Sequence, residues 1–390
     1  MTIRLGVIGY GRRIRSVINH IDKFKAGTRL TAITDIRADE IRVEMVEKGI
    51  DTSGVGFYTN SDQMLEEEEL HGVLIGTRCS LHAEMAEKVL SRNLPLFLEK
   101  PIATNMDDLR FLKEAYNKSK SQVVVSFPLR VTPLVRIAKE IIDSGTIGTI
   151  EHVQAVNNVP YGSIYFKGWY RDESETGGLF LQKATHDFDY INYLLGIEPI
   201  RIAAMKSKQI FKGDKPANLR CEDCQEQEEC LESPFHAYYT RGETKGIIID
   251  TNRPWCCFAE DTGNEDSSSA LIQYETGMHV SYSQNFFARK AAGMRGARLL
   301  GYKGTLEFDW RKSELKVMMH HSPRVDVHKF DTSSMSHGGG DTVLARNFIQ
   351  VIKGEADSVA PLEAGILSVV MCLAAKESAE TGTFQDIPKV

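Results

Sequence analysis

The chain of 390 residues has no apolar run of the roughly 20 residues that a membrane-spanning helix requires, so no membrane partner is expected. It has no basic surplus either, because 47 Lys and Arg against 53 Asp and Glu give a net charge of −6. Proteins that bind nucleic acid generally carry a basic surplus or stripe, so we expect no nucleic-acid partner. The N-terminus begins directly with a strand pattern and has no signal-peptide pattern.

Cysteine is sparse, with seven residues, and the odd number argues against a disulfide scaffold. Unpaired thiols are typical of a reducing compartment, which predicts a cytoplasmic protein. The composition is otherwise that of a globular chain, 42% hydrophobic and 26% charged. At roughly 150 residues per domain, this length predicts two domains, each with its own core.

Short apolar strands alternate with helical patterns over residues 1–128. This alternation implies right-handed crossovers, and it predicts a doubly wound α/β domain with a parallel sheet. The expected strands are Ile3–Ile8, Leu30–Asp35, Gly56–Tyr58, Val73–Ile75, Leu96–Leu98 and Val123–Phe127.

Residues 129–390 have a different pattern, in which longer strands dominate. Thr276-Gly277 and Lys303-Gly304 read as hairpin turns between neighbouring strands, which predicts an α+β domain with an open, mostly antiparallel sheet. Two helices, about residues 342–353 and 362–381, close the chain. The expected strands are Ile150–Val156, Ile200–Ser207, Ala270–Tyr274, His279–Asn285, Ala297–Leu300, Leu306–Asp309 and Leu315–Met319.

Two glycines, Gly9 and Gly11, separate the first strand from the first helix. Glycine there lets backbone N–H groups approach a pyrophosphate at the helix N-terminus, although the third small residue of the full fingerprint is replaced by Ile14. Asp35 ends the second strand about 20 residues further on, where a carboxylate accepts hydrogen bonds from an adenosine ribose. The pattern predicts NAD binding, and it leaves NADP open because Arg37 would soften repulsion of a 2′-phosphate.

Several motifs together resemble the Gfo/Idh/MocA oxidoreductase family. They are VIGYG near the start, FLEKP from Phe97 and GGLFLQKATHDFDYINYLLG from Gly177. The resemblance implies a Rossmann domain followed by an α/β domain with an open sheet. It also implies NAD(P)-dependent oxidation or reduction of a sugar-like small molecule, a sugar or polyol. Family members often form homo-oligomers, dimers or tetramers, through that sheet.

The resemblance also implies roles for particular residues. Lys100 would lie beside the nicotinamide and bind the reacting hydroxyl, and His186 matches the family's catalytic histidine. Thr77 and His82 fall in the loop and helix start that line the cofactor cleft. The predicted cofactor contacts are Gly9, Gly11, Arg12, Arg13, Asp35, Thr77, His82, Glu99 and Lys100.

The segment after Gly178 reads as a helix whose polar face carries Gln182, His186 and Asp189. Oxidation of an alcohol by hydride transfer needs a base for the hydroxyl proton and a positive group for the developing alkoxide. We assign the first role to His186 and the second to Lys100, and we take Asp189 as a substrate contact. The alternative is a solvated helix face with a structural histidine.

One feature departs from the family pattern. Many family dehydrogenases carry Asp four residues before the histidine, where this chain has Gln182, which can orient by hydrogen bonds but cannot carry a proton. The next residue, Lys183, either brings a second positive charge to the catalytic site or points to solvent. In the site, it would lower the pKa of a neighbouring lysine or bind an acidic substrate group.

Two loops are candidate substrate contacts. The first, residues 160–171, is rich in aromatics, and Tyr165, Trp169 and Arg171 either wall a sugar site or cover a sheet. The second precedes a helix with the run HGGGD, and His337 either contacts substrate or belongs to a plain connector.

The segment 212–260 reads as an insertion with few apolar repeats and a cluster of cysteines. Cys221, Cys224 and Cys230 with Cys257 have the spacing of a structural zinc site, which would staple a long loop. Free thiols, or less readily an iron–sulfur cluster, are the alternatives.

The leading interpretation is an NAD(P)-dependent dehydrogenase of CH–OH groups. A second is an NAD-dependent glycoside hydrolase that oxidises a sugar transiently and eliminates the aglycone. A third is a non-catalytic dinucleotide-binding regulator, which would have no need of both Lys100 and His186.

Overall fold

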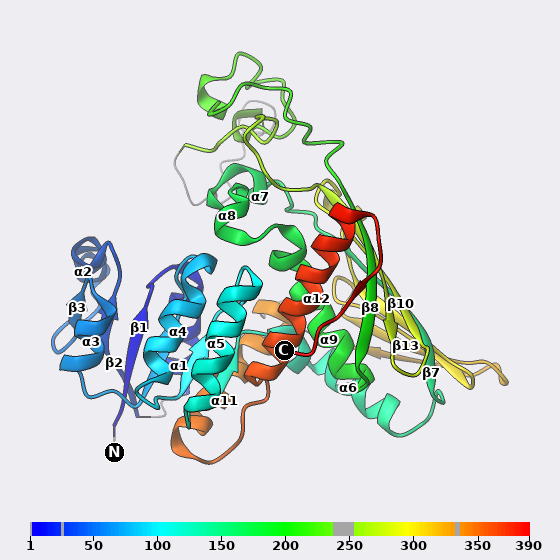
Figure 1. Ribbon diagram of the computed structural model, residues 1–390, viewed down its shortest axis with the longest axis horizontal. Helices are drawn as coiled ribbons and strands as arrows, with labels where there is room; N and C mark the ends of the chain where they lie inside the picture. The colour runs from blue at the N-terminus through cyan, green and yellow to red at the C-terminus, as the bar shows by residue number, and fades with distance from the viewer. Residues whose placement is uncertain (1, 25–26, 237–252, 332–335) are drawn as a thin grey trace.

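The computed structural model describes residues 2–24, 27–236, 253–331 and 336–390. Its core is built on two sheets, a parallel one near the N-terminus and a larger one in the second part of the chain. Figure 1 shows these sheets at opposite ends of the molecule, with α12 (Leu362–Thr381) between them. The predicted fold class, a Rossmann domain followed by an α+β domain, is confirmed.

The first sheet has six parallel strands in the order β3-β2-β1-β4-β5-β6, which is a doubly wound arrangement. Its strands are short and mostly apolar, as expected for strands that helices cover on both faces, although β2 also contains Arg29 and three threonines. Its elements are β1 (Ile3–Ile8), α1 (Arg12–Lys23), β2 (Thr28–Thr34), α2 (Ala38–Glu47), β3 (Gly56–Tyr58), α3 (Ser61–Glu67), β4 (Gly72–Ile75), α4 (His82–Leu90), β5 (Leu96–Leu98), α5 (Met106–Lys118) and β6 (Val123–Val125).

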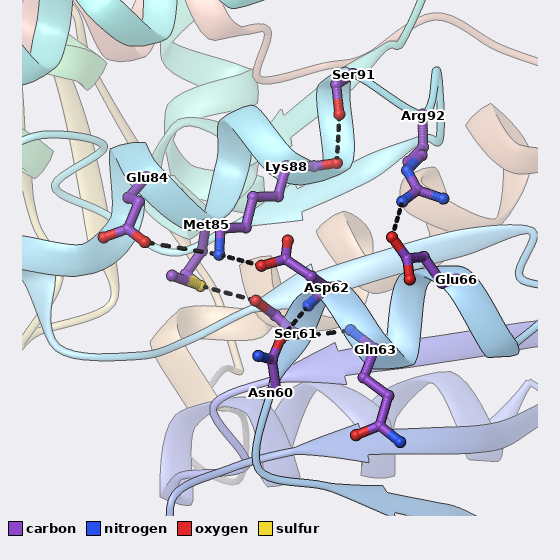
Figure 2. Close-up of polar contacts among 10 residues, drawn as sticks. All are labelled: Asn60, Ser61, Asp62, Gln63, Glu66, Glu84, Met85, Lys88, Ser91 and Arg92. Carbon is purple, nitrogen blue, oxygen red and sulfur yellow. Dashed lines mark hydrogen bonds and ion pairs between the residues drawn. The ribbon is translucent and has the colours of Figure 1, made fainter.

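Polar contacts fix the ends of the covering helices, as Figure 2 shows for α3 and α4. Asn60 caps α3 by accepting a hydrogen bond from the backbone N–H of Asp62 at 2.7 Å. Lys88 of α4 then reaches the Asp62 carboxylate at 2.9 Å, and Arg92, just after α4, reaches Glu66 at 3.4 Å. These ion pairs link α3 to α4.

The second sheet has nine strands in the order β14-β13-β12-β11-β7-β10-β9-β8-β15. The β7–β10 pair is parallel and the other neighbours are antiparallel, and both predicted hairpins are present. Its strands are β7 (Ile150–Asn158), β8 (Pro199–Ser207), β9 (Ser267–Tyr274), β10 (His279–Asn285), β11 (Met294–Gly301), β12 (Gly304–Asp309), β13 (Glu314–Met319), β14 (Val325–Lys329) and β15 (Gln385–Asp386). The accompanying helices are α6 (Pro133–Asp143), α7 (Ile164–Lys167), α8 (Glu173–Thr176), α9 (Thr185–Leu195), α11 (Gly340–Lys353) and α12.

Helix α12 joins the two parts of the molecule. It is apolar on nearly all sides, because it packs against β8 and α9 of the second part and against α5 and β6 of the first. Helix α11 likewise returns to pack on α1. Both late helices therefore complete the core of the first part, although they follow residue 128 in the chain. The predicted division of the chain at residue 128 stays a prediction.

Two strands were not predicted. β14 is largely exposed at one edge of the large sheet, and its apolar alternation is limited to Val325 and Val327. β15 has only two residues. Across the described ranges, no helix is both long enough and apolar enough to cross a bilayer.

Candidate active site

The glycine loop after β1 is shaped by close backbone contacts. Gly9 has a φ of +82°, and a Cβ there would lie 2.7 Å from the backbone nitrogen of Thr77. A Cβ on Gly11 would make only an ordinary van der Waals contact, 3.8 Å from the carbonyl oxygen of Gly76. Ile14, which breaks the fingerprint, packs against Gly76 so closely that a Cβ on Gly76 would lie 2.2 Å from it. Gly76, which directly follows β4, is therefore the small residue that lets α1 pack closely against the sheet.

Asp35 lies directly after β2 and beside this loop. Its carboxylate accepts hydrogen bonds from the backbone N–H of Tyr10 at 2.9 Å and from that of Arg37 at 3.0 Å. Arg12 is exposed in the first turn of α1. An open glycine turn, a helix N-terminus and a carboxylate at the next strand end fit the pyrophosphate and ribose of a dinucleotide.

Arg13 and Glu99, two predicted cofactor contacts, are engaged with the protein itself. The Arg13 guanidinium donates to Glu99 at 2.9 Å, to Asp341 at 2.5 Å and to Ser126 at 3.0 Å. The network joins α1 to α11, so both residues have a clear structural role, and their contact with a cofactor stays a prediction.

Thr77 lies in the loop that follows β4, and His82 begins α4. The His82 ring is buried, and its Nδ1–H donates to the carbonyl of Pro101 at 2.7 Å. Burial lowers the pKa of His82, which keeps this ring neutral. The histidine thus holds Pro101, the residue that follows Lys100 across a cis peptide bond.

Lys100 extends from the end of β5 to the second part of the chain. Its Nζ donates to the carbonyl oxygen of Gln182 at 2.8 Å. Gln182 lies in a π-helical turn, Phe180–Ala184, ahead of α9, and such turns often mark functional sites. The Gln182 amide is turned away, donating to Cys79 Sγ at 3.1 Å and to the Thr176 carbonyl at 3.3 Å. Its backbone therefore contributes more directly to the site than its side chain.

The charges around Lys100 tune its protonation. Burial and the nearby Lys183 lower the pKa of Lys100 to about 8, and Arg295 acts in the same direction. Cys79 and Glu99 oppose the shift. Lys100 is therefore charged at neutral pH but is poised to lose its proton just above it.

His186 lies in the first turn of α9. It is buried, and its ring stands edge-on to Phe127 with the centroids 6.0 Å apart. Burial, followed by the positive charge of Lys100, holds the pKa of His186 well below its ordinary value, so the imidazole is neutral. Within the described ranges its Nδ1 has no hydrogen-bond partner. A neutral, buried imidazole suits the predicted role of a base.

Lys183 points into the protein. Of the two alternatives for this side chain, solvent or site, the structure therefore favours the site. Its Nζ donates to the hydroxyl of Tyr161 at 2.9 Å and lies 4.7 Å and 4.9 Å from the ring centres of Tyr161 and Tyr165. Tyr165 thus lies beneath Lys183 in the predicted substrate loop.

Asp187 and Arg295 belong to the site and were not predicted. The Asp187 carboxylate is fully buried and accepts hydrogen bonds from Arg295 Nε at 2.8 Å, Asn157 at 2.8 Å and Tyr282 at 2.9 Å. The one signal in the sequence was an Asp at the margin of the apolar face of the helix, where a buried carboxylate requires a cation. Nothing in the spacing identified Arg295 as that cation, because β11 is more than a hundred residues away.

The other predicted substrate contacts are more dispersed. Asp189 forms a buried, two-pronged ion pair with Arg130 at 3.0 and 2.5 Å, so its carboxylate is already occupied. Arg171 pairs with Asp261 at 2.5 Å, and Trp169 stacks on Tyr170 beneath the guanidinium of Arg78. These residues hold the loops together, and their contact with substrate stays a prediction.

His337 lies just before α11 with a φ of +43°, and its Nδ1 is 2.8 Å from Asp341. Asp341 also binds Arg13, so it links His337 to the Arg13 network. His337 is close enough for its charge to contribute to the lowered pKa of His186.

The predicted zinc site is not borne out. In the parts of the chain that the structure describes, no group of three or more His, Cys, Asp or Glu side chains could hold a metal ion. Cys257 instead packs in a small apolar cluster with Phe166 and Phe211, and Cys221 Sγ donates to the Trp255 carbonyl at 3.5 Å. Cys224 and Cys230 are partly exposed free thiols.

The described parts of the insertion, which lie beyond α7 and α8 in Figure 1, are held by other contacts. The buried ammonium of Lys167 donates to the carbonyl of Glu232, and Arg171 binds Asp261. These contacts hold the insertion in place, which is the role for which zinc was predicted.

Models of two domain families match most of the chain. They are "Oxidoreductase family, NAD-binding Rossmann fold" over residues 3–127 and "Oxidoreductase family, C-terminal alpha/beta domain" over residues 139–387. The Bacillus subtilis protein YteT is 28% identical over 347 residues, 80% of this chain and 79% of that protein. A myo-inositol 2-dehydrogenase of Thermotoga maritima is 29% identical over 200 residues, 50% of this chain and 56% of its own length.

Solved structures share the fold over the whole chain. A levoglucosan dehydrogenase in complex with NADH and levoglucosan has a TM-score of 0.78 at 18% identity, with 100% of both chains covered. The myo-inositol 2-dehydrogenase of Lactobacillus plantarum has a TM-score of 0.73 at 18% identity, also over 100% of both chains.

The fold and the site together define a two-domain, NAD-binding oxidoreductase. The glycine loop and Asp35 lie on the side predicted to bind the dinucleotide, and Lys100 meets the turn that precedes His186 on the other. The chain belongs to the Gfo/Idh/MocA oxidoreductase family.

The position of Asp35 leads to a prediction about cofactor choice. We expect Asp35→Ala to weaken NAD binding about 10- to 100-fold, because it removes the charged acceptor to which the ribose hydroxyls would donate hydrogen bonds. NADP binding should be retained or improved, since the repulsion of its 2′-phosphate is lost while Arg37 remains. Titration of each nucleotide by calorimetry measures both effects. Asp39→Ala, in the exposed first turn of α2, is the control, and equal losses of NAD and NADP would contradict the prediction.

Proposed function

We propose that the enzyme oxidises a CH–OH group of a sugar or polyol derivative, with NAD as hydride acceptor, and that Lys100 and His186 form the reaction centre. The observation that carries this proposal is the 2.8 Å hydrogen bond between Lys100 and the Gln182 carbonyl, which brings the EKP lysine of the dinucleotide domain to the helix of His186. The names of several relatives support the substrate class, because they are dehydrogenases of inositols and of levoglucosan.

Lys100 and His186 have different roles in the proposed oxidation. Lys100 is charged at neutral pH, and its remaining N–H bonds are available to orient the reacting hydroxyl and to stabilise the alkoxide as it develops. His186 is neutral and takes the hydroxyl proton. NAD, when bound, supplies the ring carbon that accepts the hydride. The Gln182 carbonyl holds Lys100 in place and is a positioning group.

We also propose that copies of the chain associate through the open face of the large sheet. A hollow of about 790 Å³ lies on that face, lined by residues of β7 to β12 and by the C-terminal end of α12. Met205 and Leu271 are exposed there, and a dimer would cover them. The seven cysteines are free thiols, which supports a cytoplasmic location for the enzyme.

The reaction-centre proposal is tested by replacing Lys100 with methionine, which keeps the length of the side chain but removes its charge. We expect Lys100→Met to lower kcat/KM for NADH formation by about 10²- to 10⁴-fold while the affinity for NAD changes little. Absorbance of NADH with a panel of sugars and polyols measures the first effect, and calorimetry measures the second. Lys118→Met, at the exposed end of α5, is the matched control.

Two outcomes would contradict the proposal. Wild-type-like turnover in Lys100→Met would remove Lys100 from the reaction. Release of an aglycone from aryl glycosides without net NADH would shift the assignment to redox-assisted glycoside cleavage.

The lowered pKa of Lys100 predicts a pH dependence. We expect kcat/KM for alcohol oxidation to fall as the pH rises through about 8, where Lys100 loses its charge. His186 contributes no fall in this range, because its pKa lies far lower. Lys183→Gln removes a positive neighbour, so the pKa of Lys100 should rise and the falling limb should move to higher pH. Arg295, Cys79 and Glu99, the other charged or titratable neighbours of Lys100, are unchanged in that variant.

The measurement is the pH–rate profile of the wild type, of Lys183→Gln and of the control Lys118→Gln. A limb that stays in place, or moves to lower pH, in Lys183→Gln would show that Lys183 does not act on Lys100.

A further inference from the structure

Three cations come together at the reaction centre from three different elements. Lys100 follows β5, Lys183 lies in the π-helical turn, and Arg295 lies in β11. Lys183 and Arg295 are both close enough to act on Lys100 and on His186. Within the described residues, the only ion pair made by any of the three joins Arg295 to Asp187. The centre therefore has a surplus of positive charge.

The nearby carboxylates cannot neutralise Lys183. Asp187 accepts from Arg295 with one oxygen and from Asn157 and Tyr282 with the other. Glu99 binds Arg13 at 2.9 Å. Asp189 binds Arg130. Each of these charges already has its own cation.

Lys183 is unusual as a buried cation. Only 6% of the residue is exposed, and a buried ammonium normally has an anionic partner. Here the charge is met by the hydroxyl of Tyr161 and by the faces of Tyr161 and Tyr165. These contacts stabilise the ammonium but leave its charge uncompensated. They also form a cage that is open to solvent on one side, because Tyr161 itself is 49% exposed.

Further donors face the same region. Arg295 uses Nε for Asp187, while its buried Nη2 has no hydrogen-bond partner among the residues that the structure describes. The charge of Lys183 lowers the pKa of the Tyr161 hydroxyl, which makes that hydroxyl a stronger donor. An anion at the mouth of the cage would meet a cation and a polarised hydroxyl together.

We propose that the substrate carries a carboxylate, so that it is a sugar acid, and that Lys183 with Tyr161 binds this carboxylate. The inference rests on the proposed function, since it names the substrate class of the same site. One carboxylate compensates Lys183 and leaves the charge of Lys100 free for the reacting hydroxyl, whereas a phosphate would bring close to two negative charges. Lys100 is left to act on the reacting hydroxyl, at a different position on the same sugar.

The test compares sugar acids with neutral molecules of the same shape. NAD-loaded wild-type protein is assayed for NADH formation with glucuronate, galacturonate and gluconate, and with glucuronamide and glucose. We expect kcat/KM for a carboxylate to exceed that for its amide by at least about 30-fold. Lys183→Met should remove the difference, mainly through KM, while Lys183→Arg should restore part of it. Lys118→Met should keep the full difference.

Binding provides a second measurement that does not depend on turnover. Calorimetry with NADH-loaded protein should show tighter binding of glucuronate than of glucuronamide in the wild type and equal binding in Lys183→Met. If Lys183→Met fails to fold, Tyr161→Phe tests the same site from its exposed rim, and we expect a several-fold loss that is confined to the acid.

The outcomes separate the two proposals. Equal use of acid and amide, with NADH formed, would overturn the sugar-acid inference and leave the proposed function intact. Lys183-dependent binding of acids without any NADH would overturn the proposed function and support the anion site. A preference for sugar phosphates over sugar carboxylates would overturn the choice of carboxylate.

Discussion

The hydrogen bond from Lys100 to the Gln182 carbonyl is the contact on which the site depends. It joins the end of a parallel strand to a π-helical turn from the other sheet's domain, and it does so at the point where His186 begins α9. His82 supports it from below by holding the Pro101 carbonyl. Helix α12 joins the two parts of the molecule as a whole, and this contact brings Lys100 to the turn that precedes His186.

Burial and nearby charges lower the pKa values of the two proposed catalytic residues at this contact. Burial alone would push the pKa values of Lys100 and His186 down, and the clustering of Lys183 and Arg295 adds to both shifts. The result is a lysine poised just above neutrality beside a histidine that stays neutral, which is the pairing that alcohol oxidation needs. The same clustering leaves Lys183 without an anion, so one charge surplus accounts both for the tuning of Lys100 and for the inferred sugar-acid specificity.

The sequence was most informative where chemistry and secondary structure coincide. The alternation of strands and helices predicted the parallel sheet, and a motif on a recognisable element was enough to propose Gly9, Asp35, Lys100 and His186 as site residues. The contacts between distant elements could not be predicted. Arg130 on Asp189 and Arg295 on Asp187 are pairings that only the folded chain brings together. The cysteine spacing suggested zinc, but spacing does not show that Cys257 has a place in an apolar cluster.

In the proposed reaction a hydride leaves a sugar carbon, while Lys100 stabilises the oxygen and His186 accepts its proton. The most direct measurement is to incubate the NAD-loaded protein with a sugar acid deuterated at its C–H positions and to weigh the cofactor by mass spectrometry. We expect NADH that carries one deuterium atom, together with an oxidised sugar. NADH without deuterium, or a sugar consumed while the cofactor never acquires the label, would contradict it.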